Sequence, residues 1–167
     1  MTFPAFHPAN SPHHFLAQLA GSWSGTTRTW LDPDSEPSES QTQGSFQVIL
    51  DGRFVIYLYE SSVDGEPQHG MFTFGFNTGT NQYEASWLDS YHNNTAIMHC
   101  VGRPLDHGFS VLGSYPDPQG NGPEWGWRTE LELVDADSLN LTGYMVNPEG
   151  GEAVAVKTVL ARVRSAS

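Results

Sequence analysis

The chain lacks most of the features that mark disulfide-bonded, membrane-spanning or nucleic-acid-binding proteins. It contains one cysteine, Cys100, so an intramolecular disulfide cannot form and a reducing compartment is expected. Only 7 of its 167 residues are Lys or Arg against 19 Asp or Glu, and the net charge of −12 argues against nucleic acid or an anionic membrane surface as a partner. No apolar run reaches the roughly 18 residues of a membrane-spanning helix. Residues 1–10 have neither a basic start nor a long apolar stretch, so no signal peptide is expected and the predicted location is cytoplasmic.

Charged residues of either sign are also scarce, at 16% of the chain against about 25% in an average domain. Aromatic residues make up 12% of the chain and hydrophobic residues 38%, which excludes a disordered chain and fits one globular domain. The 17 glycines and 11 prolines are spread along the chain rather than clustered. This distribution is typical of a fold with many turns.

One short helix is predicted near the N-terminus. Ser11 can cap its first turn, Pro12 suits the first helical position, and Gly21 supplies a stop. The apolar residues between them have helical spacing, so the helix is expected to span residues 12–20. We expect residues 1–21 to form an extended arm and this helix, which caps one end of the domain that follows.

From residue 22 onward the hydrophobic pattern alternates with a period of two, as in half-buried strands. Turn residues such as Asp64 with Gly65 separate the segments, and no crossover helix joins them. The predicted strands are Ser22–Trp30, Gln41–Leu50, Arg53–Glu60, Gln68–Asn77, Gln82–Asp89, Thr95–Val101, Gly108–Ser114, Glu124–Val134, Ser138–Val146 and Glu152–Arg164. They predict an all-β fold, a single antiparallel up-and-down β-barrel of about ten strands over residues 22–167, because closure removes exposed edges. The acidic, Ser/Pro-rich stretch Leu31–Ser40 is expected to be a mobile flap.

The start of the first predicted strand resembles the opening of calycin barrels, the group that contains lipocalins and fatty-acid-binding proteins. In this motif a helix end is followed by Gly21, any residue and Trp23. Three further segments strengthen the likeness, namely Val48–Phe54, Thr73–Asn77 and Tyr83–Ser90. In this order, from residue 12 to its end, the chain resembles the bacterial domain-of-unknown-function family 1579, which implies a lipocalin-like barrel and no established reaction. Asn77 stands where that family often has Asp, so no carboxylate role is implied there.

The lipocalin resemblance also implies a barrel floor. In lipocalins the indole of the Gly-x-Trp motif packs under an arginine from the last strand, and Trp23 with Arg162 or Arg164 matches this pair. The first and last strands must be neighbours if the barrel closes, and a guanidinium stacked on an indole is favourable. Arg162 is the preferred partner because it lies farther from the terminus, where strands fray.

Alternating aromatic residues on several predicted strands indicate the lining of a ligand cavity. Trp87 and Asp89 share one strand face, so the Asp89 carboxyl either anchors a ligand or acts as a general base, or it binds the backbone of the turn that follows. The other residues expected to contact a ligand are Phe72, Phe74, Trp125 and Trp127. Arg128 is expected on the solvated outer face, unless a bulge turns it inward as a clamp for an anion.

The seven histidines show no metal-binding pattern. No His-x-His, His-x-x-x-His or Cys-x-x-Cys spacing occurs, so no metal site is predicted. His99 alternates in phase with Ile97 and Val101, and it is expected either to face the interior as a ligand contact or to be a core histidine bonded to a neighbour. The opening at Trp23 is also similar to that of nitrobindin-like haem barrels, but the last predicted strand holds no His for the iron, so no cofactor is predicted.

These observations leave three functions open. The leading interpretation is a non-catalytic barrel that binds a small hydrophobic or amphipathic molecule in an apolar cavity. The second is a small acid–base enzyme, similar to an isomerase or cyclase, that uses Asp89 or His99. The third is a solidly packed structural or interaction module. Cys100 lies outside any nucleophile motif and is interpreted as a small packed residue.

Overall fold

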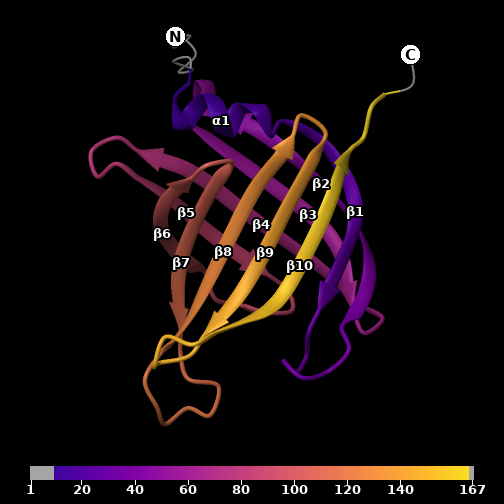
Figure 1. Ribbon diagram of the computed structural model, residues 1–167, viewed down its shortest axis with the longest axis vertical. Helices are drawn as coiled ribbons and strands as arrows, with labels where there is room; N and C mark the ends of the chain where they lie inside the picture. The colour runs from indigo at the N-terminus through magenta and orange to yellow at the C-terminus, as the bar shows by residue number, and fades with distance from the viewer. Residues whose placement is uncertain (1–9, 166–167) are drawn as a thin grey trace.

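The chain forms a closed antiparallel barrel of ten strands, which confirms the fold expected from its alternating pattern. The computed structural model describes residues 10–165. Successive strands pair with each other, and β1 closes the circle against β10 (Figure 1). The elements are α1 (Pro12–Gln18), β1 (Gly21–Thr29), β2 (Ser38–Ile49), the 3₁₀ turn η1 (Leu50–Gly52), β3 (Phe54–Val63), β4 (Glu66–Asn77), β5 (Gln82–Asp89), β6 (Met98–Leu105), β7 (Gly108–Tyr115), β8 (Trp125–Asp135), β9 (Ser138–Val146) and β10 (Glu152–Arg162).

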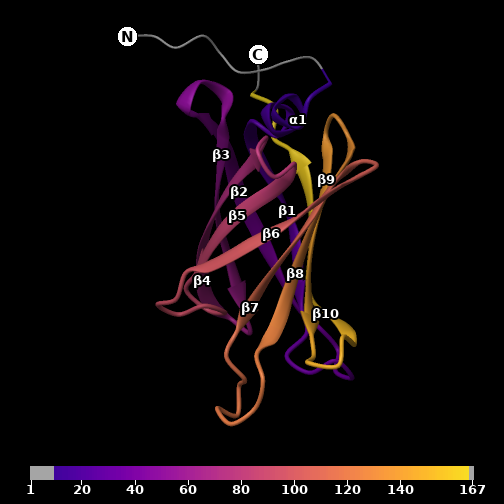
Figure 2. The ribbon, with the colours of Figure 1, turned by 90° about the vertical axis from the view of Figure 1, so that its left-hand side faces the viewer.

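The helix α1 lies across one end of the barrel, which we call the closed end (Figures 1 and 2). Ser11 caps its first turn, because the Ser11 side chain accepts a hydrogen bond from the His14 amide at 3.1 Å. Leu16 and Leu19 are fully buried, so the helix covers the barrel with its apolar side. It ends at Gln18 rather than at residue 20, and the arm expected to precede it lies almost wholly outside the described residues.

Two strand boundaries differ from the expectation. The strand β2 begins at Ser38, so the connection expected to be a flap over Leu31–Ser40 is shorter. The strand β6 begins only at Met98, because the Ala96 amide donates to the Asn93 carbonyl at 2.8 Å and keeps the preceding segment in a turn. Both connections lie at the end of the barrel opposite α1.

Two columns of aromatic rings fill much of the barrel interior. One column stacks Phe74 on Phe72 and Phe72 on Trp87, with ring centroids 5.0 and 5.3 Å apart. In the other column Phe46 stacks on Tyr57 at 4.1 Å. The fully buried leucines that pack around them are Leu16, Leu19, Leu131, Leu139 and Leu160. The closed half of the barrel is therefore a solid hydrophobic core.

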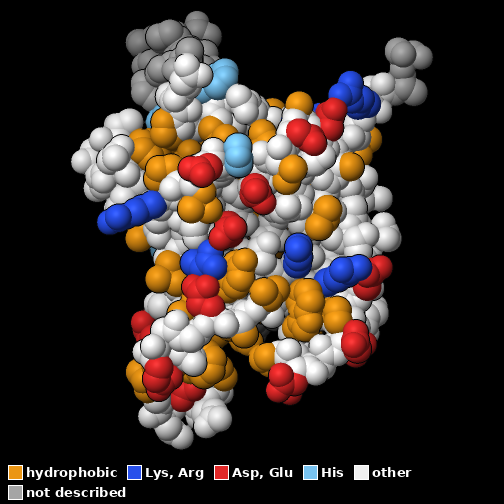
Figure 3. Space-filling model, viewed as in Figure 1, with side chains coloured by type: hydrophobic (Ala, Val, Ile, Leu, Met, Phe, Trp, Pro, Cys, Tyr) orange, Lys and Arg blue, Asp and Glu red, His pale blue; other side chains and the backbone are white. Residues whose placement is uncertain are grey.

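The outer face carries the charged residues. Arg128 donates to Glu152 through Nε at 2.8 Å and Nη2 at 2.9 Å, and to Glu130 through Nη1 at 2.7 Å. Its guanidinium also lies 3.9 Å from the centroid of the Tyr144 ring, so Arg128 belongs to an outer ion-pair network and not to an anion clamp. Figure 3 shows acidic, basic and apolar side chains mixed over this surface. Within residues 10–165, α1 is too short and no other helix is long or apolar enough to cross a bilayer.

Candidate ligand-binding pocket

A pocket penetrates the barrel at the end opposite α1, which we call the open end. It contains about 450 Å³ of space not filled by protein atoms, part of it open to solvent. Figure 3 shows this end hollowed between the β7–β8 connection and the β1–β2 connection. The residues that line the pocket are Thr27, Thr42, Tyr57, Tyr59, Ser61, Gln68, Phe72, Trp87, His92, Trp127, Thr129, Leu141, Gly143, Val156 and Thr158.

One wall of the pocket is aromatic. Trp87 of β5 stacks on Phe72 of β4 with ring planes only 2° apart, because these two residues are direct partners in the β4–β5 register. Trp127 of β8 lies 5.0 Å from Trp87, and Tyr57 with Tyr59 continues the wall on β3 with centroids 5.2 Å apart. The wall offers a ligand both apolar area and ring faces for stacking.

The other wall carries a chain of hydroxyl groups, which sequence analysis did not foresee. Thr27 of β1 hydrogen-bonds to Thr42 of β2 at 2.5 Å and to Thr158 of β10 at 2.8 Å. The chain continues from Thr42 to Ser61 of β3 at 2.8 Å and from Ser61 to Ser40 at 2.9 Å. Each hydroxyl donates one hydrogen, so the four bonds among these five groups leave one hydrogen for another acceptor.

Thr129 of β8 adds a hydroxyl without a partner. The residue is only 1% exposed, it lines the pocket, and its Oγ1 is the one buried side-chain polar atom of the described residues that makes no hydrogen bond. An unsatisfied buried hydroxyl destabilises a fold by about 1–3 kcal/mol. A polar atom left in this state on a pocket wall points to a partner from outside the chain, either water or a ligand.

Asp89 at the end of β5 binds the backbone of the turn that follows, which is one of the roles that the sequence left open, and it does not line the pocket. Its Oδ1 accepts the backbone amides of Tyr91 at 2.8 Å and His92 at 2.7 Å, and these bonds hold the turn. Its Oδ2 accepts the hydroxyl of Tyr59 and the Gln68 Nε2 group, the latter at 2.8 Å. The Asp89 side chain is fully buried behind Tyr59 and Gln68, so it holds the polar groups of the pocket in position without lining it.

The electrostatics keep this carboxyl ionised. Burial alone raises the pKa of Asp89, but hydrogen bonds from His92 and Tyr59 outweigh burial and lower the pKa from 3.8 to about 2. Burial, followed by the negative charge of Asp89, raises the pKa of the Tyr59 hydroxyl well above its usual value. The phenol therefore stays protonated and donates to a permanent negative charge behind the aromatic wall.

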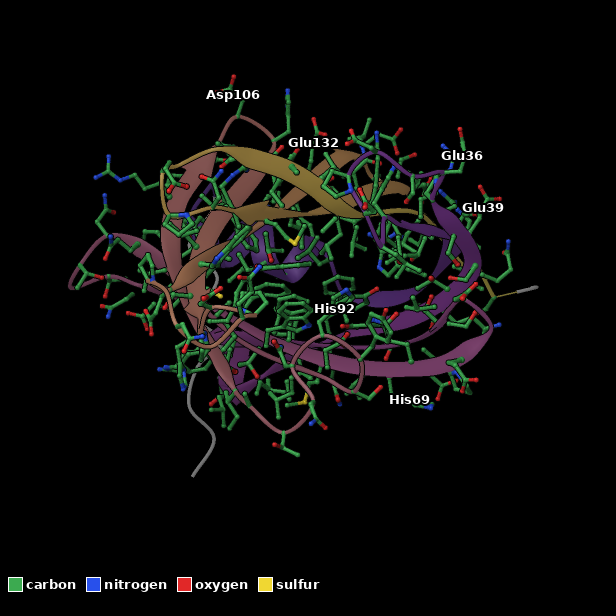
Figure 4. All side chains as sticks on the ribbon, turned by 90° about the horizontal axis from the view of Figure 1, so that it is seen from below. Glu36, Glu39, His69, His92, Asp106 and Glu132 are labelled. Carbon is green, nitrogen blue, oxygen red and sulfur yellow. The ribbon has the colours of Figure 1, made fainter. Side chains whose placement is uncertain are left out.

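His92 connects this buried charge to the pocket. Its Nδ1 lies 3.3 Å from Asp89 Oδ1 and 3.3 Å from Gln68 Nε2. An ionised carboxylate attracts an N–H and repels a ring lone pair, and this charge-assisted contact outweighs the contact with the Gln68 amide nitrogen, which is itself a donor. We therefore assign the hydrogen to Nδ1, which makes Nε2 an acceptor in the neutral ring. Among the described residues Nε2 has no partner. Seen from below, His92 lies near the middle of the open end, whereas Glu36 and Glu39 lie at its rim (Figure 4).

The structure brings together some of the residues expected to contact a ligand and separates others. Phe72, Trp87 and Trp127 line the pocket. Phe74 is completely buried and lies deeper in the core, where its ring stacks on Phe72. Trp125 is half-buried at the start of β8 and does not line the pocket.

His99 lies on the outer face of β6, so the expectation that it faces the interior is wrong. Its neighbours Met98 and Cys100 are the buried residues, because they pair with the inward-facing positions of β5. The histidine of the pocket is instead His92, to which sequence analysis assigned no role. The available signal was its position three residues after Asp89, close enough to share one turn.

Arg162 lies over Trp23 at the closed end, the pair selected from the sequence as the barrel floor. The guanidinium carbon is 4.3 Å from the indole centroid. Trp23 Nε1 donates to the Leu19 carbonyl at 2.8 Å, while Arg162 donates to the carbonyls of Ala20 at 2.5 Å and Gln18 at 2.8 Å. The pair therefore joins the last strand to the end of α1.

Two other chemistries have little basis in residues 10–165. In that part of the chain no three His, Cys, Asp or Glu side chains are placed to share a metal ion. Cys100 is buried, and burial raises the pKa of its thiol to about 11, so the residue is not a thiolate nucleophile near neutral pH.

A ten-stranded antiparallel barrel that is closed at one end by a helix and contains a pocket at the other is a lipocalin-like barrel. The chain belongs to the family described as "Protein of unknown function (DUF1579)", which matches residues 8–162. No curated protein sequence matches the chain.

Two solved structures share the fold. The S-type phycobiliprotein lyase CPES from Guillardia theta has a TM-score of 0.60 and 14% sequence identity, over 95% of this chain and 96% of that one. Rv2717c from M. tuberculosis has a TM-score of 0.59 and 16% identity, over 92% of this chain and 99% of that one. At these identities the likeness concerns the fold alone.

Proposed function

We propose that this protein binds a small amphipathic molecule in the pocket at the open end of the barrel. The observation that carries the proposal is the pair of polar atoms in the pocket lining that lack partners, Thr129 Oγ1 and His92 Nε2. A pocket without a ligand role could use an apolar side chain in place of Thr129 and avoid the penalty of an unsatisfied buried hydroxyl. The aromatic wall facing the hydroxyl chain supplies the apolar half of an amphipathic site.

The alternative of a solidly packed module fits the closed half of the barrel better than the open half. Leucine and aromatic side chains fill the closed half, whereas the open half contains a pocket whose wall includes Thr27, Thr42 and Thr158. These threonines hydrogen-bond to one another, and they line the pocket with hydroxyl groups that can accept further hydrogen bonds. Polar side chains of this kind are suited to contact with a ligand or water.

Native mass spectrometry of freshly purified protein tests the proposal, because a ligand that co-purifies appears as an added mass. A second measurement uses N-phenyl-1-naphthylamine, an uncharged probe that becomes fluorescent in apolar sites. Val156 of β10 lines the pocket and Val159 lies on the outer face of the same strand, so Val156→Trp and Val159→Trp form a matched pair. We expect the Val156→Trp variant to abolish probe binding and the Val159→Trp variant to keep it. Equal binding by both variants would place the probe elsewhere and contradict the proposal.

A second candidate function, acid–base catalysis, is favoured by the contact between His92 and the ionised Asp89. In this function Nε2 of His92 removes a proton from a carbon next to a carbonyl group and returns it to a different carbon of the resulting delocalised enolate, so a double bond moves without any co-reactant. The fold is shared with a protein named as a lyase, which supports a chemical role for this kind of barrel.

Deuterium exchange into phenylacetone, an enolisable aromatic ketone, tests the catalytic candidate by NMR. We expect faster exchange with the native protein than with the His92→Gln variant, and the exposed His99→Gln variant should behave as the native protein does. Exchange that is equally slow with all three proteins would remove this function and leave the binding function standing.

A further inference from the structure

We infer that the ligand of the pocket is an uncharged, flat aromatic compound that carries a polarised O–H or N–H group, as a phenol or an indole does. This inference rests on the proposed function and specifies the chemical class that the pocket binds. Three properties of the lining lead to it, namely its charge, its unused hydrogen-bonding atoms and its aromatic wall.

The charge of the pocket disfavours anions. None of the described residues that line it is Lys or Arg, and the ionised Asp89 lies directly behind it. A carboxylate or phosphate group would lose its hydration shell and meet a negative charge without a compensating cation. Fatty acids and nucleotides are therefore poor ligands. The net charge of −12 on the whole chain also repels anions.

Cations are also disfavoured, because the buried charge is already satisfied. The Asp89 carboxylate accepts hydrogen bonds from Tyr59, Gln68 and the amides of Tyr91 and His92, and the Nδ1–H of His92 is 3.3 Å away. An ionised carboxylate has about four lone-pair sites, so little capacity remains for an ammonium group. The site suits an uncharged molecule.

The unused hydrogen-bonding atoms define the polar group of the ligand. Nε2 of His92 is an acceptor, so the ligand must offer a donor. The His92 ring lies 5.5 Å from the Trp87 ring and 5.2 Å from the Trp127 ring, so a donor that reaches Nε2 is attached to a framework in contact with both indoles. Thr129 Oγ1 can accept from or donate to the same ligand at a second point.

The aromatic wall selects a flat framework. Phe72, Trp87 and Trp127 all line the pocket. A planar ring pairs favourably with aromatic side chains of this kind, either offset-stacked or edge to face. A ring O–H or N–H is also a stronger donor than an alkyl hydroxyl, which matches the histidine acceptor.

Isothermal titration calorimetry with three naphthalene probes tests the inference. The probes are 2-naphthol, which has a donor, 2-methoxynaphthalene, which lacks it, and 2-naphthoate, which is anionic. We expect 2-naphthol to bind the native protein about tenfold or more tightly than either of the other two, because the methyl ether cannot donate to His92 Nε2 and the naphthoate brings a charge without a partner. The His92→Phe variant keeps a ring of similar size and should bind 2-naphthol and 2-methoxynaphthalene equally, whereas the His99→Phe variant should retain the native preference.

The Thr129→Val variant provides a second measurement that does not depend on His92. It should weaken 2-naphthol binding by a smaller factor than His92→Phe does. Native protein that prefers 2-naphthoate, or that does not distinguish the naphthol from its methyl ether, overturns the ligand class. If the native protein binds the probes with either of these patterns and Val156→Trp abolishes the binding, the proposed function stands while the inference fails. Failure of all three probes and of N-phenyl-1-naphthylamine contradicts both.

Discussion

The imidazole of His92 and the carboxylate of Asp89 stand three residues apart in one turn, with Nδ1 and Oδ1 separated by 3.3 Å. The carboxylate is buried and the imidazole lines the pocket. A charge that never contacts the ligand space thus determines which ring nitrogen of a pocket residue carries hydrogen. The same contact therefore affects both the folding stability of the open end and the hydrogen-bonding role of His92 in the pocket.

Replacement of Asp89 by Asn should lower the free energy of unfolding by about 2–3 kcal/mol near neutral pH. The pKa of Asp89 is about 2 in the folded protein against 3.8 for the unperturbed group, so the ionised form stabilises the fold above pH 3.8 and this contribution is lost as the pH falls toward 2. Urea denaturation at several pH values should show the native and Asp89→Asn curves converging across that window. A stability difference that is constant with pH would contradict the assignment, and Asp106→Asn, on an exposed turn, controls for the substitution itself.

Substitution of two threonines in the pocket lining by valine should have opposite consequences. The Thr27 hydroxyl bonds to both Thr42 and Thr158, so Thr27→Val breaks the chain and should destabilise the protein by about 2 kcal/mol. The Thr129 hydroxyl has no protein partner, so Thr129→Val should leave stability unchanged or raise it by up to about 1 kcal/mol. Thermal or urea denaturation of the two variants checks this, and an equal loss in both would show that the hydroxyl bonds contribute little.

The barrel floor should behave as a coupled pair. Trp23→Ala removes a fully buried indole and should cost about 3–5 kcal/mol of stability. Arg162→Ala removes the contact over the indole and the bonds to the Ala20 and Gln18 carbonyls, and should cost about 2 kcal/mol. In urea denaturation the double variant should lose less than the sum by about 1 kcal/mol. Additive losses would mean that the two side chains act independently, and Arg162→Lys distinguishes charge from guanidinium geometry.

The single thiol should be inert in the folded protein. Burial raises the pKa of Cys100 to about 11, so near neutral pH the residue is a buried thiol rather than a thiolate. A disulfide reagent such as 5,5′-dithiobis(2-nitrobenzoate) should react with it only after unfolding in urea. Rapid reaction of the native protein would indicate that β6 opens readily on the time scale of the assay.

Local sequence patterns were enough to predict most of the fold. Alternation of apolar residues with a period of two is a property of each segment by itself, so the ten strands could be predicted before any pairing was known. The Trp23–Arg162 contact could also be anticipated, because the resemblance to lipocalins implies it and a closed barrel makes the first and last strands neighbours. Boundaries were less accurate, since the turn that delays β6 to Met98 depends on a backbone bond between Ala96 and Asn93.

The face of β6 shows where a local pattern is insufficient. Ile97, His99 and Val101 have the same phase as a buried strand would, yet they are exposed, while Met98 and Cys100 face inward. Both phases of this strand contain apolar residues, so the sequence does not distinguish them. The register with β5 does, because a shift of one residue exchanges the two faces of a strand.

The sequence by itself determined the class of this protein, a helix-capped antiparallel barrel with an aromatic interior, because periodicity, turn residues and closure act locally or follow from strand order. Only the tertiary structure decided which polar atoms share the pocket. Thr27 meets Thr42 across 15 residues and Thr158 across 131, and Asp89 meets Tyr59 across 30. Such contacts depend on the register of neighbouring strands and on the path of a turn, and a one-residue slip in either would separate them.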